Sequence, residues 1–86
     1  MFKKGHCYKA YDKHTNSTFI AIYMGCEKGY PCMICGKGNN AKGFNVYQGE
    51  SENPTKAEVE DYISNKGYET FFYGNEHLPT LIEEIF

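Results

Sequence analysis

The distribution of apolar and polar positions in the first half of the chain predicts a β-hairpin and a third strand. Residues 6–12 alternate, and residues 18–25 are β-branched, aromatic and apolar on both faces. Residues 13–17 between them are rich in turn-forming side chains, so the two strands are expected to pair as a hairpin. An irregular segment at 26–42 follows, and residues 43–48 are predicted to form the third strand.

The second half begins with a helix predicted at about residues 56–66. Thr55 suits the N-cap position, and Glu58 completes a capping box that satisfies two backbone N–H groups at the helix start. Gly67 follows at a position where helices commonly end in glycine. The helix carries one apolar stripe, formed by Val59, Tyr62 and Ile63.

The remaining residues predict a strand at 68–73 and a final helix at about 78–86. Pro79 lies near the first turn of this helix, where proline is tolerated. The apolar residues of the segment recur at helical spacing and are expected to pack on the core: Leu78, Leu81, Ile82, Ile85 and Phe86.

The order of these elements, β-β-β-α-β-α, predicts an α+β fold in a single domain over residues 1–86. We expect a small, mainly antiparallel sheet of three to four strands, with two helices on one face and a cysteine-containing knuckle loop. Residues 1–48 supply the hairpin, this loop and the third strand. Residues 49–86 supply the helix, strand and helix that follow.

The composition is that of a small globular protein. Hydrophobic residues make up 41% and charged residues 23% of the 86 residues. No apolar run approaches the roughly 20 residues that span a bilayer, and no apolar signal segment follows Lys3 and Lys4. The sequence therefore predicts a cytoplasmic protein, in a compartment where cysteines are free thiols or metal ligands more often than disulfides.

The segment PCMICGKG carries the clearest chemical motif of the chain. Cys32 and Cys35 are separated by two residues and followed by Gly36. This spacing lets both sulfurs face one ion, and the glycine permits a turn that directs backbone N–H groups at the thiolates. The segment resembles the knuckle of zinc ribbons and rubredoxin-like sites, and the resemblance implies two ligands of a zinc site.

Cys7 and Cys26 are the predicted remaining ligands. With the hairpin turn centred near residues 15–16, Cys7 is expected to lie across from Met24 or Gly25 and therefore close to Cys26. A site of four thiolates has no open position, so the zinc ion would stabilise the fold rather than catalyse a reaction.

Three other interpretations of the cysteines stay open. A redox-active dithiol is favoured where a helix begins after the first thiol, and the sequence GKGNNAKG after Cys35 is a poor helix start. Reduced cysteines without a metal are the second alternative, and disulfides in an oxidising compartment are the third.

Charge and aromatic content favour a macromolecular partner over catalysis. The histidines are scattered, and no segment matches the phosphate-binding loop G-x-x-x-x-G-K-[ST], so we expect no enzymatic activity. The net charge of −2 combines +5 over residues 1–43 with −7 over residues 44–86, which favours an electrostatic partner surface or attraction between the two halves. Aromatic residues reach 16%, and tyrosine is favoured at interfaces. The predicted partner-binding residues are Tyr30, Lys37, Glu58 and Asp61.

Together these features predict a small non-enzymatic protein-interaction module with a structural zinc ion, of a size that suits a phage or mobile-element inhibitor of a host protein. The alternative is a zinc-ribbon-like nucleic-acid-binding protein, in which Lys28, Lys37 and Lys42 contact phosphates and Tyr30 stacks on a base. The chain has no arginine, which disfavours sequence-specific reading of bases. A dithiol redox protein is a further alternative.

Overall fold

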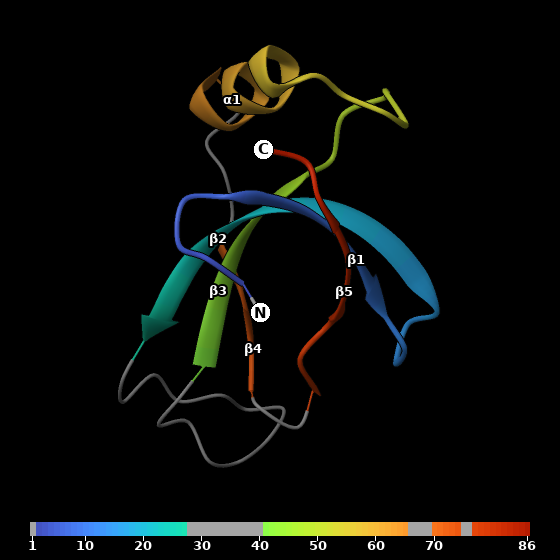
Figure 1. Ribbon diagram of the computed structural model, residues 1–86, viewed down its shortest axis with the longest axis vertical. Coiled ribbons are helices and arrows are strands. Elements are labelled where there is room, and N and C mark those ends of the chain that lie inside the picture. Colours follow the sequence, from blue (N-terminus) through green and yellow to red (C-terminus); the bar gives the residue numbers. More distant parts are fainter. Residues whose placement is uncertain (1, 28–40, 66–69, 75–76) are drawn as a thin grey trace.

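Five strands and one helix make up the regular structure of the described residues in this computed structural model (Figure 1). The structure describes residues 2–27, 41–65, 70–74 and 77–86. The strands are β1 (Cys7–Asp12), β2 (Ser17–Glu27), β3 (Ala41–Tyr47), β4 (Thr70–Tyr73) and β5 (Thr80–Glu84), and the helix is α1 (Lys56–Asn65).

All five strands belong to one antiparallel sheet with the order β4-β3-β2-β1-β5. β1, β2 and β3 are neighbours in chain order, and β4 joins the free edge of β3 after the helix. β5 returns to the opposite edge and pairs with β1. The two edges of the sheet therefore come from β4 and β5, the last two strands in the described part of the chain.

The predicted fold class is wrong in its last element, because residues 80–84 form β5 and not part of a second helix. The sheet consequently has five strands rather than three to four, and the described residues contain one helix. In β5, Leu81 packs against the core while Ile82 is 51% exposed. A helix as short as the predicted one is marginal in water. A strand at this position instead supplies partners for the backbone groups along the open edge of β1.

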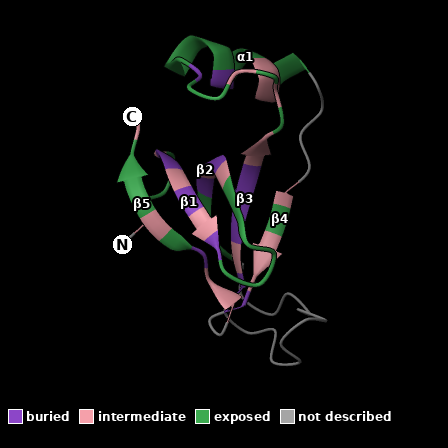
Figure 2. Cartoon of the chain, turned by 90° about the vertical axis from the view of Figure 1, so that its right-hand side faces the viewer, coloured by how far each residue is buried: buried purple, intermediate pink, exposed green. Residues whose placement is uncertain are grey.

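The sheet is strongly curved and has two apolar faces. In Figure 1 it forms an arch, with α1 above it and the N-terminal segment beneath it. Figure 2 shows buried residues concentrated on the three central strands, whereas β5 is mostly exposed. The inner, concave face is built around Tyr8, Ala21, Tyr23 and Phe44. The outer, convex face is built around Cys7, Ile20 and Val59, the last of these from α1.

The helix prediction is confirmed. α1 begins at Lys56, and the backbone N–H of Glu58 donates to Thr55 Oγ1 at 3.2 Å. The Glu58 carboxylate in turn accepts from the backbone N–H of Thr55 at 3.5 Å, as a capping box requires. Val59 is fully buried and fixes the helix on the convex face. Gly67, the expected residue after the helix end, lies outside the described residues.

The hairpin is confirmed, but its predicted register is wrong. Cys7 pairs with Ile22, not with Met24 or Gly25. The connection is a tight turn over residues 13–16, because Asp12 already pairs with Ser17. Asn16 closes this turn with a φ of 51°, a left-handed conformation that asparagine tolerates better than most residues.

Candidate functional site

Aromatic side chains gather on the concave face. The alternation of β1 places Tyr8, Ala10 and Asp12 on this face. Phe44 lies at its centre and is fully buried, with ring centroids of Tyr23 at 5.2 Å and of Tyr73 at 5.7 Å. Rings at these distances pack edge-to-face or tilted, which adds a specific contact to the burial of apolar area.

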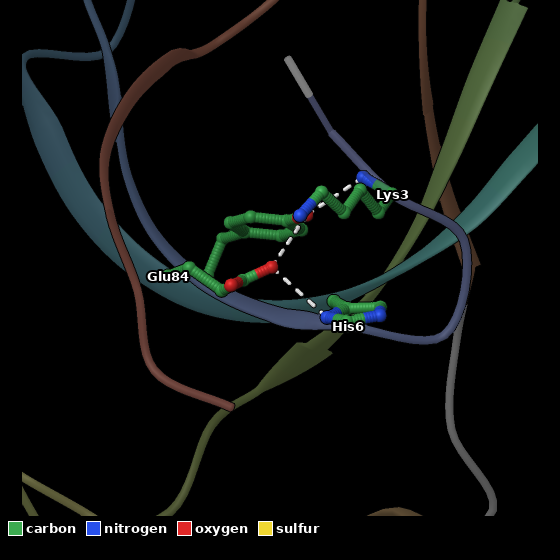
Figure 3. A network of polar contacts seen from close by, with 4 residues as sticks. Lys3, His6 and Glu84 are labelled. Atoms are coloured by element: carbon green, nitrogen blue, oxygen red, sulfur yellow. Dashed lines mark hydrogen bonds and ion pairs between the residues drawn. The ribbon is translucent and has the colours of Figure 1, made fainter.

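The N-terminal segment closes one part of the concave face. The ring of Phe2 lies 5.0 Å from that of Tyr8 and 4.9 Å from that of Phe44. A polar network next to it, shown in Figure 3, ties this segment to β5. The backbone N–H of Lys3 donates to the Tyr8 hydroxyl at 2.6 Å, and that hydroxyl donates to Glu84 Oε1 at 3.2 Å. His6 Nδ1, itself shielded from solvent, lies 2.9 Å from the same carboxylate oxygen.

A pocket of about 430 Å³ opens on the concave face toward the β1–β2 turn. We call it the Asp12 pocket, and it is lined by Asp12, Thr15, Ser17, Phe19, Val46, Gln48, Phe71, Phe72 and Tyr73. Its size falls in the range typical of ligand pockets. β4 contributes the outer wall, where Phe71 is 36% exposed although it pairs with the buried Phe44.

Phe19 and Tyr73 form an aromatic wall of the pocket. Their rings are nearly parallel, with an interplanar angle of 10° and centroids 6.1 Å apart. Burial raises the pKa of the Tyr73 hydroxyl, and the negative charge of Asp12 raises it further. Asp12 lines the same pocket as these two rings, so its carboxylate and the aromatic wall border one space.

Asp12 is the one charged residue among the described residues that line the pocket. It is 8% exposed, and its Oδ1 accepts a hydrogen bond from the backbone N–H of His14 at 2.9 Å. This hydrogen bond stabilises the turn and fixes the carboxylate at the end of an otherwise apolar row. The arrangement combines a buried anion with aromatic rings in one hollow.

Two histidines contact each other next to Asp12, whose carboxylate accepts from the backbone N–H of His14. His77 Nδ1 lies 2.8 Å from His14 Nε2, and the ring centroids are 4.5 Å apart. His14 belongs to the β1–β2 turn and His77 to the connection that leads into β5. The two histidines are 63 positions apart and look scattered in the sequence, which does not show that the fold brings the two connections together.

The structure does not bring Cys7 and Cys26 together. Cys7 is fully buried on the convex face beside Val59. Cys26 is exposed, and its Sγ lies 3.5 Å from the hydroxyl of Tyr23, which belongs to the concave face. A bulge explains the difference: Tyr23 pairs with Phe44 and Gly25 with Gly43, so β2 holds one extra residue and the alternation reverses.

Burial also changes the chemistry of Cys7. It raises the pKa of the Cys7 thiol from 9.0 to about 11, so the side chain stays protonated at neutral pH and behaves as a small apolar residue. Among the described residues, no three His, Cys, Asp or Glu side chains form a group that could hold a metal ion. Cys32 and Cys35 lie outside the described residues, so the zinc site as a whole remains a prediction.

The predicted partner-binding residues fall into two groups. Tyr30 and Lys37 lie outside the described residues. Glu58 and Asp61 are exposed on α1, and each already makes a local contact. Glu58 belongs to the capping box, and Asp61 Oδ1 accepts from Asn65 Nδ2 at 2.7 Å. These two carboxylates therefore stabilise the helix, whatever else they contact.

The residues that line the Asp12 pocket are not evident from the sequence as a site. One signal was present: in the alternating segment 6–12, Asp12 follows Tyr8 and Ala10 on the buried side, where an apolar residue is expected. Phe71 gave no such signal, because nothing in residues 68–73 shows that one phenylalanine faces a pocket.

Comparisons of the chain with protein-family models, with curated proteins and with solved structures gave no match. Within the described part of the chain, no helix combines the length and the apolar character needed to cross a bilayer.

Proposed function

We propose that this chain is a non-enzymatic protein-interaction module and that its partner binds in the Asp12 pocket. The observation that carries the proposal is a hollow of about 430 Å³ in which aromatic and aliphatic side chains surround one buried carboxylate. Binding sites in proteins commonly combine an apolar lining with a few placed polar groups. Pockets of this kind also accept the anchor residue of a protein partner.

Other exposed apolar residues offer less to a partner. Met24 is 40% exposed at the bulge of β2, and Ile82 is 51% exposed on β5. Neither lines the Asp12 pocket, and scattered exposed apolar residues are normal on protein surfaces. A second hollow, of about 370 Å³, mixes apolar residues with charges of both signs, since Lys9 and Glu52 both line it. The Asp12 pocket is therefore the better anchor site.

The zinc ion is a separate part of the proposal. The spacing of Cys32 and Cys35 supports it, and the exposure of Cys26 leaves that thiol accessible as a third ligand. Cys7 is excluded from the proposed ligand set because it lies buried on the opposite face. The pocket and the proposed zinc site use different residues, so each can be tested without the other.

Selection from a displayed peptide library tests the binding proposal, since it does not require a known partner. Selected peptides are measured against the wild-type protein and against Phe71→Ser and Met24→Ser, which each remove one exposed apolar side chain. We expect Phe71→Ser to weaken binding by about tenfold or more, as for an anchor pocket, and Met24→Ser to leave it unchanged. Peptides that bind all three proteins equally would place the interface elsewhere and contradict the proposal.

A further inference from the structure

The charge of Asp12 limits what can fill the pocket. The carboxylate is 8% exposed, and one of its oxygens is engaged by the backbone N–H of His14. Any ligand that fills the pocket removes water from the remaining accessible part of this group. Removing water from a charged group is costly unless the ligand supplies a compensating charge or hydrogen bond.

This condition separates three classes of ligand side chain. An acidic side chain is repelled by Asp12, because like charges in a poorly solvated site interact unfavourably. An aliphatic side chain gains contacts with Phe19 and Phe71 but leaves the carboxylate dehydrated. A side chain with an apolar stem and a positive end satisfies both parts of the pocket at once.

The aromatic lining favours the same class. A cation near the face of an aromatic ring is attracted by the negative charge density of that face. Phe19, Phe71 and Tyr73 all line the pocket, so aromatic rings border the space that a cation would enter. Burial and, after it, the negative charge of Asp12 raise the pKa of the Tyr73 hydroxyl, and both residues line this pocket. Carboxylate and rings therefore attract a cation into the same space.

We propose that the Asp12 pocket binds an alkylammonium group, as in a lysine side chain of the partner, with the stem along Phe19 and Phe71 and the cation toward Asp12. This inference rests on the proposed function and adds the chemistry of the bound residue. The pocket volume of about 430 Å³ leaves room for an ammonium group with or without methyl substituents.

The test uses three small probes on the full chain, followed by NMR signals of the pocket rings. Nα-acetyl-lysine methylamide and its trimethyl-lysine counterpart carry the cation, and Nα-acetyl-norleucine methylamide has the same kind of stem without charge. We expect the cationic probes to shift the signals of Phe19, Phe71 and Tyr73, and to bind about tenfold or more tightly than the norleucine probe. The ratio of the dissociation constants of the two cationic probes shows whether the pocket prefers a free or a methylated ammonium group.

Asp12→Asn provides the matched variant, because its amide oxygen can still accept from His14 while the charge is lost. Glu60→Gln makes the same change of charge on α1, away from the pocket. Asp12→Asn is expected to abolish the preference for the cationic probes, and Glu60→Gln to retain it. If Asp12→Asn fails to fold, salt dependence of binding to the wild-type protein gives a second measurement, since a charge-driven contact weakens at high salt.

Equal binding of the charged and neutral probes overturns the inference, and so does the absence of any shift in the pocket. The outcome of the peptide selection keeps the two proposals apart. Peptides that depend on Phe71 but carry no required lysine leave the proposed function intact and refute the alkylammonium ligand.

Discussion

The thiols of Cys7 and Cys26 lie on opposite faces of the sheet. Cys7 packs beside Val59 under the helix, whereas Cys26 Sγ lies 3.5 Å from the Tyr23 hydroxyl on the concave side. The extra residue that β2 holds before Gly25 produces this separation, and the φ of +94° at Gly25 is one that glycine adopts without strain. A single bulge thus decides which cysteines can act together.

The separation leads to different expectations for substitutions at the two cysteines. We propose that one zinc ion binds per chain and expect Cys26→Ser to reduce or abolish binding. Cys7→Ala should keep the metal and lower the free energy of unfolding by roughly 1 kcal/mol, because it removes a small buried group. Native mass spectrometry of the two variants and the wild-type protein measures how much metal each one binds. Loss of the metal in Cys7→Ala with retention in Cys26→Ser would contradict the placement of both thiols.

The raised pKa of Cys7 predicts a loss of stability at alkaline pH. The folded protein holds the thiol proton up to about pH 11, whereas the ordinary value is 9.0. Below pH 9 the thiol is protonated in both the folded and the unfolded state, so the stabilisation by the buried thiol is fully present. Between pH 9 and pH 11 the unfolded state binds fewer protons than the folded state, so the free energy of unfolding falls as pH rises. The full effect is about 2–3 kcal/mol at about 1.4 kcal/mol per pKa unit.

Chemical denaturation at pH 8 to 11 measures this effect, with Cys7→Ala as the control. Tyr23 has a pKa raised to about 12, chiefly by burial, so part of the alkaline loss remains in the variant. The slope should nevertheless be smaller in Cys7→Ala than in the wild-type protein. Identical slopes would show that the Cys7 thiol titrates normally in the folded state.

Two adjacent residues of β5 test whether this segment is a strand. Leu81 packs on the concave face, while Ile82 is 51% exposed. We expect Leu81→Ala to lower the free energy of unfolding by about 1–3 kcal/mol and Ile82→Ala to change it by less than about 0.5 kcal/mol. The predicted helix over residues 78–86 placed both on one apolar face. Equal decreases in the free energy of unfolding for the two variants, measured by denaturant unfolding, would therefore support the helix.

Gly43 allows β3 and β4 to approach closely. A Cβ atom at this position would lie 3.0 Å from Thr70 Cγ2 and 3.2 Å from Phe72 Cε1. Gly43→Ala should therefore lower the free energy of unfolding by about 1–3 kcal/mol through overpacking. Adding Thr70→Ser removes the closer methyl group and keeps the hydroxyl that donates to Asn45 Oδ1 at 2.8 Å, so it should restore part of the stability. No rescue in the double variant would argue against this contact.

The sequence predicted the elements that local signals determine. The capping box of Thr55 and Glu58 defined the start of α1, and alternation with turn-forming residues defined the β1–β2 hairpin. These features depend on residues a few positions apart, so no knowledge of the rest of the fold was needed.

The features that the sequence did not predict depend on distant parts of the chain. The apolar residues of 78–86 recur at helical spacing, and only the pairing of residues 80–84 with the edge of β1 makes this segment a strand. The hairpin register follows from the four-residue turn between Asp12 and Ser17, in which Asn16 has a positive φ, and composition alone does not place this turn. The Asp12 pocket forms only because the curved sheet brings Asp12 of β1 near Phe71 of β4.

The most direct test of the proposed binding site is the location of a bound peptide. A peptide from the library selection, isotopically unlabelled, is added to labelled protein and intermolecular nuclear Overhauser effects are recorded. We expect contacts from one peptide side chain to the ring protons of Phe19, Phe71 and Tyr73. Contacts confined to Met24 or Ile82, with none to these rings, would contradict the assignment of the Asp12 pocket as the binding site.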